Sequence, residues 1–442
     1  MGIPDRPDII IKGGVLVTMV EGQDFVENAN VWIKEDKIID IQTSRNGDPF
    51  QDADDIIDAK NSIVMPGLIN SHSHAAMTLF RGYADDLPLH QWLFEKIFPA
   101  ETRYLTPETV YWASLLGCLE MIASGTTSFV DGYFFQDETF RAANQSGLRG
   151  FIAQGIIDFP APGVPDPTMN LEIGREFIQK WLGFSDILSP GLFCHSPVTC
   201  SGKTLKGAMD ISGEFSLPLQ MHLSETMDDV REILTRTGML PVPYLAELGL
   251  LNENLITAHS VHLATEEITL LARDRVNVVH VPESNMKLSS GVARVADMAK
   301  MGMKMGIGTD GCASNNNLDL FQEMDTAAKL AKVFTLDPTN MDAATVLKMA
   351  TSWGACIMGL ENEIGTIEVG KKADIIVIDT DCPHMIPLYH PISQIVYSAN
   401  GGDVRHVIVN GKILMRDRVF QTLDPEEIME RVQTIRNKTI SG

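Results

Sequence analysis

Eight short apolar runs, separated by segments with helical spacing, occupy the middle of the chain and constrain its fold most strongly. The runs are Ile63–Ile69, Thr126–Val130, Arg149–Ile156, Gly191–His195, Leu217–Leu223, Leu255–His259, Val276–Val281 and Met303–Gly308. The segments between them include Pro107–Ser124, Asp228–Thr237, Thr265–Arg273 and Leu318–Phe334. Eight strand–helix units in about 300 residues predict an α/β fold of the (β/α)8, TIM-like barrel type. A doubly wound open sheet is the alternative, but no Gly-x-Gly-x-x-Gly sequence follows any run to support it.

Short β-rich runs at both ends of the chain predict a small β domain that the two termini build together. The first end carries residues 9–17, 29–33 and 37–41, with turn residues between them, which indicates an antiparallel meander. The far end carries residues 373–379 and 406–414, with a hairpin signal at Asn410-Gly411. Because isolated hairpins are marginal in water, we expect the two ends to pair as a β-sandwich. The expected divisions are residues 1–64 and 366–442 for this domain and 65–365 for the barrel.

Charge and composition exclude several classes of partner. The chain has 442 residues, of which 58 are acidic and 35 basic, giving a formal net charge of −23. Such a field repels nucleic acids and anionic membrane surfaces, so neither is an expected partner. No apolar run approaches the roughly 18 residues that span a bilayer, and no signal-peptide pattern is apparent. The six cysteines form no Cys-x-x-Cys pair and indicate a reducing compartment, so the expected location is the cytoplasm.

Polar residues gather where the apolar runs end. They are His72, His74, Asp131, His195, His222, His259, His280 and Asp310. In barrels of this type the chemistry lies at the carboxyl ends of the strands. Histidines that merely fill a core would not favour one end of their strands. The placement therefore predicts a functional site at the barrel mouth.

A metal site is the first prediction for this mouth. His72 and His74 stand two residues apart, so in a strand both side chains point to one face. Such a pair is weak evidence by itself, but His222 can complete the three-histidine set of a catalytic zinc. Asp310 lies at the end of the last run and can bind the metal and accept a proton from its water. The alternative for Asp310 is an Asx-turn before a helix.

Three further residues are candidates for proton transfer and substrate binding. Glu225, three residues after His222, can address the bound water, and its alternative is a solvated carboxylate in the first turn of a helix. His259 can orient the water or stabilise developing charge. His195 can contact substrate or be an ordinary core histidine. The fourth run ends Cys194-His-Ser-Pro, without the lysine that bridges two metals in related barrels, so a single metal is predicted.

The set Pro66-Gly67…His72-Ser-His74, His222-Leu-Ser-Glu225, His259 and Gly308-Thr-Asp310 resembles the mononuclear branch of the amidohydrolase superfamily. The resemblance covers essentially the whole chain. More narrowly, the chain resembles the 5-methylthioadenosine/S-adenosylhomocysteine deaminases. The stretches that carry this likeness are residues 81–93, Pro99-Ala-Glu101, His195-Ser-Pro, residues 284–291 and Asp310-Gly-Cys-Ala-Ser314.

The resemblance implies a role for each candidate residue. The implied ligands of one divalent metal per subunit, Zn²⁺ or Fe²⁺, are His72, His74, His222 and Asp310. The implied catalytic residues are Glu225, His259 and Asp310. The implied substrate contacts are Trp92, Glu101, His195, Glu225, Asp310 and Ser314, of which Glu101 would accept the two ribose hydroxyls. The segment Leu89–Phe98 is expected to form an amphipathic lid helix that brings Trp92 and Glu101 over the mouth, with an ordinary surface helix as the alternative.

The implied reaction is hydrolytic deamination of the adenine ring of 5′-methylthioadenosine, S-adenosylhomocysteine or a related nucleoside, giving the inosine analogue and ammonia through a metal-activated water. The alternative is a guanine or s-triazine hydrolase of the same superfamily, from which the diol acceptor Glu101 would distinguish it. Gln154 stands where an arginine for the amino-acid tail of S-adenosylhomocysteine is expected, which favours methylthioadenosine. A homo-oligomer is expected for barrels of this kind.

Overall fold

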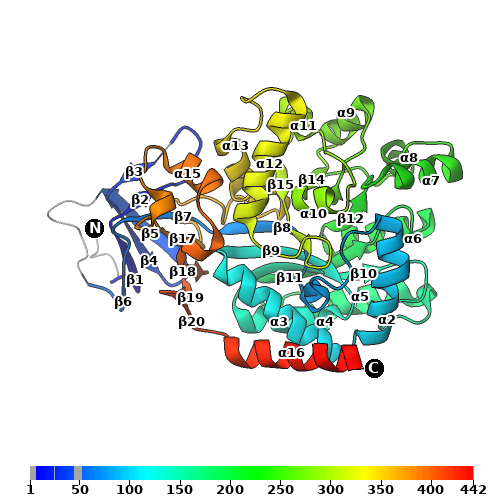
Figure 1. The fold of residues 1–442 in the computed structure, drawn as a ribbon, viewed down its shortest axis with the longest axis horizontal. Helices are drawn as coiled ribbons and strands as arrows, with labels where there is room; N and C mark the ends of the chain where they lie inside the picture. The colour runs from blue at the N-terminus through cyan, green and yellow to red at the C-terminus, as the bar shows by residue number, and fades with distance from the viewer. Residues whose placement is uncertain (1–5, 24, 44–51, 442) are drawn as a thin grey trace.

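A large sheet wrapped by helices lies beside two smaller sheets at one end of the molecule (Figure 1). The computed structural model describes residues 6–23, 25–43 and 52–441, without the side chains of 439–441. Residues 1–5 and 44–51 of the predicted small domain lie outside this description. No helix in the described ranges is long and apolar enough to cross a membrane.

The large sheet has nine parallel strands within the described residues, in the order β15-β14-β13-β12-β11-β10-β9-β8-β16. Its strands are β8 (Leu68–His74), β9 (Thr126–Tyr133), β10 (Arg149–Ile156), β11 (Leu188–Cys194), β12 (Leu219–Leu223), β13 (Leu255–His259), β14 (Asn277–His280), β15 (Met305–Ile307) and β16 (Asp310–Gly311). Only Gly308 and Thr309 separate β15, which pairs with β14, from β16, which pairs with β8. One chain segment thus bonds to both edges and curls the sheet, which confirms the predicted α/β class with parallel strands.

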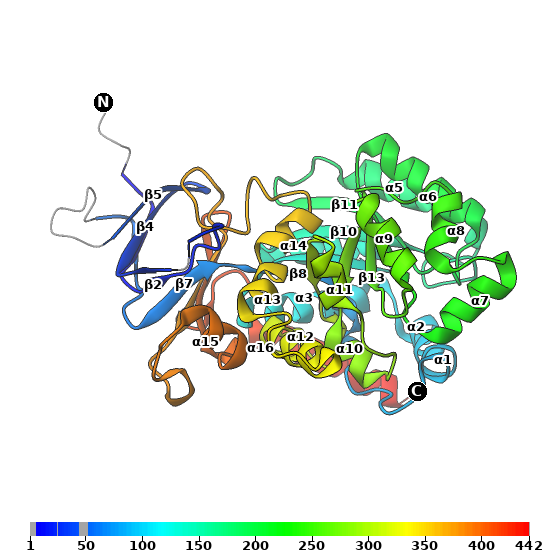
Figure 2. The ribbon, with the colours of Figure 1, turned by 90° about the horizontal axis from the view of Figure 1, so that it is seen from above.

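Helices cover the outside of the curled sheet (Figures 1 and 2). Those that follow its strands are α3 (Pro107–Ala123), α4 (Gln136–Ser146), α5 (Asn170–Trp181), α6 (Gly202–Phe215), α7 (Met227–Thr237), α8 (Pro241–Glu247), α9 (Thr265–Arg273), α10 (Pro282–Lys287), α11 (Val295–Lys300), α12 (Leu320–Thr335), α13 (Ala343–Met349) and α14 (Ser352–Ile357). The four predicted helices are confirmed. Local sequence explains their starts: before α3, for example, the Thr106 hydroxyl accepts from the Thr109 N–H, and Pro107 occupies the first turn.

The predicted run Ile63–Ile69 is two strands that belong to different sheets, so the prediction of one barrel strand was wrong there. The first, β7 (Ser62–Pro66), pairs with the small-sheet strands β2 and β17. The second is β8, which contains His72 and His74. Between them, a Cβ on Gly67 would lie 2.1 Å from the side chain of Thr127, so only glycine fits this crossing. The continuous apolar sequence hid the split because both strands are fully buried.

Strands from both termini share one of the smaller sheets, as predicted. Within the described residues it has the order β20-β19-β18-β17-β7-β2-β3, and a four-stranded sheet has the order β5-β4-β1-β6. The remaining strands are β1 (Ile9–Lys12), β2 (Val15–Leu16), β3 (Val26–Glu27), β4 (Ala29–Lys34), β5 (Lys37–Thr43), β6 (Asp55–Asp58), β17 (Ile375–Asp379), β18 (Val404–Val409), β19 (Lys412–Arg416) and β20 (Val419–Phe420). Two helices complete this end of the chain, α15 (Pro391–Tyr397) and α16 (Pro425–Ser441), and α16 lies along α3 (Figure 1).

Two turn predictions can be compared with these sheets. The Asn410-Gly411 hairpin is confirmed, since both residues have positive φ, +49° and +73°, between β18 and β19. The antiparallel meander at the first end is only partly right. β1, β4 and β5 are antiparallel neighbours, but β1 also pairs with β6 in parallel. The chain leaves this sheet for the other one at Gly13 and Gly14, whose φ values are +76° and +90°.

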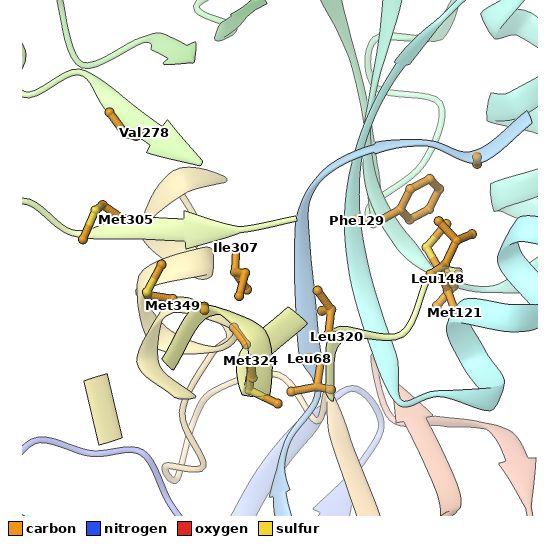
Figure 3. Packing of buried hydrophobic residues seen from close by; sticks show 14 of the residues in the cluster. Leu68, Met121, Phe129, Leu148, Val278, Met305, Ile307, Leu320, Met324 and Met349 are labelled. Atoms are coloured by element: carbon orange, nitrogen blue, oxygen red, sulfur yellow. The ribbon is translucent and has the colours of Figure 1, made fainter. Parts of the chain in front are cut away.

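The main core fills the space between the curled sheet and its helices. Leu68 and Phe129 come from the adjacent strands β8 and β9, and Ile307 comes from β15, while Leu320 and Met324 project from α12 (Figure 3). Each of these side chains is at most 1% exposed. Burial of one such side chain stabilises the fold by roughly 1.5–3 kcal/mol, so these contacts hold α12 against the outer face of the curled sheet.

A buried ion pair ties the curled sheet to the terminal sheets. At the start of β10, Arg149 Nε and Nη2 donate to the carboxylate of Asp374 at 2.8 and 3.1 Å. Replacing Arg149 with methionine is expected to lower the free energy of unfolding by about 3–5 kcal/mol, because Asp374 would stay buried without its partner. Urea denaturation measures the loss. The control is Arg231→Met, which removes the exposed pair with Asp228 and should change little. Equal effects of the two variants would contradict the prediction.

Candidate metal centre and substrate pocket

The four predicted metal ligands lie together at the carboxyl end of the curled sheet. Three of them, His72, His222 and Asp310, lie with His259 in a group whose ligand atoms are all within 4.8 Å of one another. Nε2 of His74 lies 3.1 Å from Oδ1 of Asp310 and 3.3 Å from Nε2 of His222. Residues up to 238 positions apart in the sequence therefore meet in one cluster because parallel strands end at the same edge.

The hydrogen bonds around the cluster leave its donor atoms directed inward. Nε2 of His72 is buried without a hydrogen-bond partner among the described residues. Nδ1 of His74 lies 2.5 Å from the Gly132 carbonyl, which can only accept, so the proton is on Nδ1 and the Nε2 lone pair is free. The hydroxyls of Ser284 and Ser314 donate to Oδ2 of Asp310 at 2.7 and 2.8 Å, which leaves Oδ1 facing the histidines. Imidazole nitrogens and a carboxylate oriented in this way fit a divalent metal such as zinc.

Burial sets the charge states of these groups. It lowers the pKa of His72 to about 4 and that of His222 well below its ordinary value, so both rings are neutral, as metal ligands must be. Burial alone would raise the pKa of Asp310. The neighbouring His72 and His74 rings outweigh it and hold the pKa well below the ordinary value. The cluster thus presents the neutral rings of His72 and His222 beside the carboxylate of Asp310.

Glu225 and His259 lie next to this cluster. Oε2 of Glu225 is 3.7 Å from Nε2 of His259, and the Ser290 hydroxyl donates to Oε1 at 3.3 Å. Nδ1 of His259 lies 2.9 Å from Oδ1 of Asn285, and this amide oxygen accepts a hydrogen bond from the Nδ1–H group. Burial raises the pKa of Glu225 to about 7. A carboxyl group with such a pKa can both release and hold a proton at neutral pH, which suits general acid–base work.

A cavity of about 70 Å³ opens over the cluster. Every predicted substrate contact lines it, namely Trp92, Glu101, His195, Glu225, Asp310 and Ser314. His195 points its ring toward that of His222, with centroids 5.1 Å apart, and burial lowers its pKa to about 3, so it is neutral. Ser314 reaches the site through its bond to Asp310. The structure therefore brings together all the residues that the sequence assigned to the site.

One side of the cavity is a helical segment longer than predicted. The lid helix was expected over Leu89–Phe98, but helix continues through α1 (Leu89–Gln91), a π-helical turn η2 (Trp92–Ile97) and α2 (Phe98–Tyr104). It lies at the end of the molecule away from the terminal sheets (Figure 2). Trp92 and Glu101 are 5% and 2% exposed. Burial raises the pKa of Glu101 to about 7, against the effect of a hydrogen bond from Tyr133.

Two other polar residues have structural surroundings, Asp131 in β9 and His262 beyond the end of β13. Asp131 accepts from the Ala75 N–H at 2.6 Å and from the Gln136 side chain at 2.8 Å, so it holds the turn that follows β8. Nε2 of His262 lies 2.6 Å from the Ser290 carbonyl. These bonds fix the segments that carry His74 and Glu225.

Sequence reasoning missed several side chains of the site. They are Tyr133, Ser284, Asn285 and Ser290, which bond to Glu101, Asp310, His259 and Glu225. Tyr133 ends β9, so the rule that drew attention to the other strand ends could have found it. The two serines and the asparagine lie in and just after α10, and no local pattern distinguishes them from ordinary helix and loop residues.

Comparison with known proteins agrees with this geometry. Residues 63–414 match the amidohydrolase family. Over 431 residues the chain is 45% identical to the 5-methylthioadenosine/S-adenosylhomocysteine deaminase 1 of Syntrophus aciditrophicus, covering 98% of this chain and 97% of that one. It is 44% identical over 429 residues to the 5′-deoxyadenosine deaminase of Methanosarcina barkeri, covering 96% and 97%.

Solved structures show the same fold. A zinc-bound adenosine deaminase from Xanthomonas campestris is similar with a TM-score of 0.96 and 33% identity, over 99% of this chain and 100% of that one. The atrazine chlorohydrolase TrzN of Arthrobacter aurescens reaches a TM-score of 0.88 at 21% identity, over 97% and 100% of the two chains, which is a likeness of fold. With its fold, its histidine and aspartate cluster and these matches, the chain belongs to the amidohydrolase family of metal-dependent enzymes.

Proposed function

We propose that this chain hydrolyses the adenine amino group of 5′-methylthioadenosine, S-adenosylhomocysteine or related adenosine nucleosides, releasing ammonia and the inosine analogue. The observation that carries the proposal is one cavity in which Glu225 lies beside the histidine and aspartate cluster while Glu101 and Trp92 line the wall. Deaminases of such nucleosides are also the relatives at 44–45% identity over nearly the whole chain.

His72, His74, His222 and Asp310 would hold one divalent ion, with Zn²⁺ the first candidate and Fe²⁺ the second. The inward-facing donor atoms support this assignment. When bound, such an ion lowers the pKa of a coordinated water from about 15.7 to about 7 and so supplies a nucleophile at neutral pH.

The protein's own groups would move the protons. Asp310 and His259 accept and orient the proton of the attacking water, and the fixed Asn285 contact keeps the His259 Nε2 lone pair available for this. Glu225 protonates the ring nitrogen adjacent to carbon 6, and the second proton of the attacking water then passes through Glu225 to the departing amine. The proton held by Asp310 or His259 restores Glu225 to its starting state. The oxygen of water thus replaces the amino group, and ammonia leaves. Acid–base help of this kind is typically worth about 10²–10⁴-fold in rate.

The wall of the cavity would bind the nucleoside. Glu101 offers two acceptor oxygens to the two ribose hydroxyls. Nε1 of Trp92 is buried without a hydrogen-bond partner among the described residues and can donate to the substrate. His195 would contact the ribose or the base, and Ser314 would act from beside Asp310.

The surroundings of the cavity favour an apolar 5′ group. Leu93, Phe98, Phe134 and Ile156 line it. Arg149, on the same strand as Gln154, is bonded to Asp374 at the end of β10 away from the cavity. We therefore propose 5′-methylthioadenosine as a better substrate than S-adenosylhomocysteine, whose tail carries a carboxylate.

A substrate panel tests the function. Purified enzyme is expected to release ammonia from 5′-methylthioadenosine with a kcat/KM at least about 10-fold above that for S-adenosylhomocysteine, because an unpaired carboxylate on an apolar wall costs more than 1 kcal/mol. Guanine and a chlorinated s-triazine, which lack a diol for Glu101, serve as controls. A coupled ammonia assay with all four compounds measures the ratios. Preference for guanine or the triazine would refute the nucleoside assignment.

We also propose that the two smaller sheets form a β-sandwich domain. Ile9 and Val31 of one sheet and Val64 and Ile375 of the other belong to one buried apolar cluster, which supports face-to-face packing. In this division residues 1–64 and 366–442 build the sandwich and residues 65–365 the (β/α)8 barrel. A homo-oligomer in the cytoplasm, without nucleic-acid or membrane partners, stays a prediction that sedimentation and cell fractionation can test.

A further inference from the structure

Tyr133 joins the helical wall of the cavity to the strand that supports the metal cluster. It is the last residue of β9 and is 5% exposed. Its hydroxyl donates to Oε1 of Glu101 at 2.5 Å, across 32 positions of sequence, and both residues line the cavity. The carbonyl of Gly132, the residue before Tyr133, accepts a hydrogen bond from Nδ1 of His74. One strand end therefore fixes both a metal-ligand ring and the carboxylate on α2.

In this pair Tyr133 is the hydrogen-bond donor and Glu101 is the acceptor. A tyrosine O–H donates and an ionised carboxylate only accepts, with about four lone-pair positions on its two oxygens. The Tyr133 bond occupies one position and fixes the orientation of the carboxylate, and the remaining positions are open to donors from the cavity. Two neighbouring hydroxyls on a sugar are matching donors.

From this geometry we infer that Tyr133 is a positioning residue that aims Glu101 at a cis-diol, so that the enzyme selects ribonucleosides over deoxyribonucleosides. The inference rests on the proposed nucleoside deaminase function. Glu101 contacts the sugar, and Tyr133 acts through Glu101. The same bond links α2 in the helical wall to β9 in the sheet. The position of the wall over the cavity therefore also affects how Glu101 meets the sugar.

The test replaces the hydroxyl and keeps the ring. In Tyr133→Phe the ring can still pack against His74 and Phe134, whose centroids lie 6.0 and 5.4 Å from it. KM and kcat are measured for the metal-loaded enzyme with adenosine, 2′-deoxyadenosine and 3′-deoxyadenosine. KM for adenosine is expected to rise about 10-fold, with kcat little changed, because the lost bond fixed the orientation of the Glu101 carboxyl group. KM for the two deoxy compounds, which present one hydroxyl each, should rise much less.

Two variants serve as references. Tyr111→Phe removes a hydroxyl that donates to Gln145 on the outer surface, away from the cavity, and should leave all three KM values unchanged. Glu101→Gln should weaken adenosine binding by itself, and adding Tyr133→Phe to it should cost little more, since residues that act as a unit are not additive. The dissociation constant of inosine, measured by calorimetry, should follow the KM of adenosine across these variants.

The outcomes separate this inference from the proposed function. An equal rise in KM for adenosine and both deoxy compounds would show that Tyr133 only shapes the cavity, and a fall in kcat alone would assign it to the chemical step. Either result overturns the inference. If the unaltered enzyme releases ammonia from no nucleoside, the proposed function itself fails.

Discussion

Replacing Glu225 with glutamine is expected to lower kcat by about 10²–10⁴-fold or more, the range typical of a lost general acid–base group. Glutamine has nearly the same shape and can still accept the hydrogen bond from Ser290. It cannot take up and release a proton, whereas burial raises the pKa of the Glu225 carboxyl to about 7 and so poises it for transfer. The variant should fold and bind metal as the unaltered enzyme does. Ammonia release, elemental analysis and thermal unfolding measure the three properties.

A matched control distinguishes this effect from a general loss of charge. Glu247→Gln removes an exposed carboxylate on α8 and should leave kcat within about twofold, since surface substitutions away from the site rarely matter. If Glu225→Gln retained most of its turnover, Glu225 would have no role in proton transfer, and His259 or Asp310 would have to supply both steps.

The metal cluster was predictable from sequence because its signal is local and repeated. His72 and His74 show the two-residue period of a strand, and His222, His259 and Asp310 each stand at the end of an apolar run. Parallel strands deliver their ends to one edge, so residues far apart in sequence need no pairwise signal to meet.

The rest depends on contacts that no local pattern encodes. The division of residues 62–74 between two sheets is decided by the close approach of Thr127 at Gly67, and both strands read as the same apolar run. The bond between Tyr133 and Glu101 joins a strand end to a helix from another part of the chain. The extension of the lid helix to Tyr104 follows a π-helical turn that ordinary helical periodicity does not predict.

Removing the metal should abolish deamination and destabilise the protein. With no ion, His72, His74, His222 and Asp310 leave inward-facing donor atoms buried, and the nucleophile for carbon 6 is lost. A ligand held at 1,000 times its dissociation constant adds about 4.1 kcal/mol to the free energy of unfolding, so chelation should lower Tm by several degrees. Adding back Zn²⁺, Fe²⁺ or Mn²⁺ should restore both properties, and the ion that restores most activity identifies the functional metal.

Substitution of one predicted metal-binding residue tests the same prediction without a chelator. His222→Ala is expected to lose the ion and nearly all turnover, because it removes one of the three predicted histidine ligands. The control is His384→Ala. His384 lies with Cys382 and Asp403 in a second group of ligand-type side chains on the terminal part of the chain, far from the cavity residues in sequence. That variant should keep the activity and the catalytic ion. Elemental analysis measures the bound metal, and the ammonia assay measures turnover. Full metal content and full turnover in His222→Ala would mean that the catalytic ion binds at other residues, and the proposed mechanism would then be wrong.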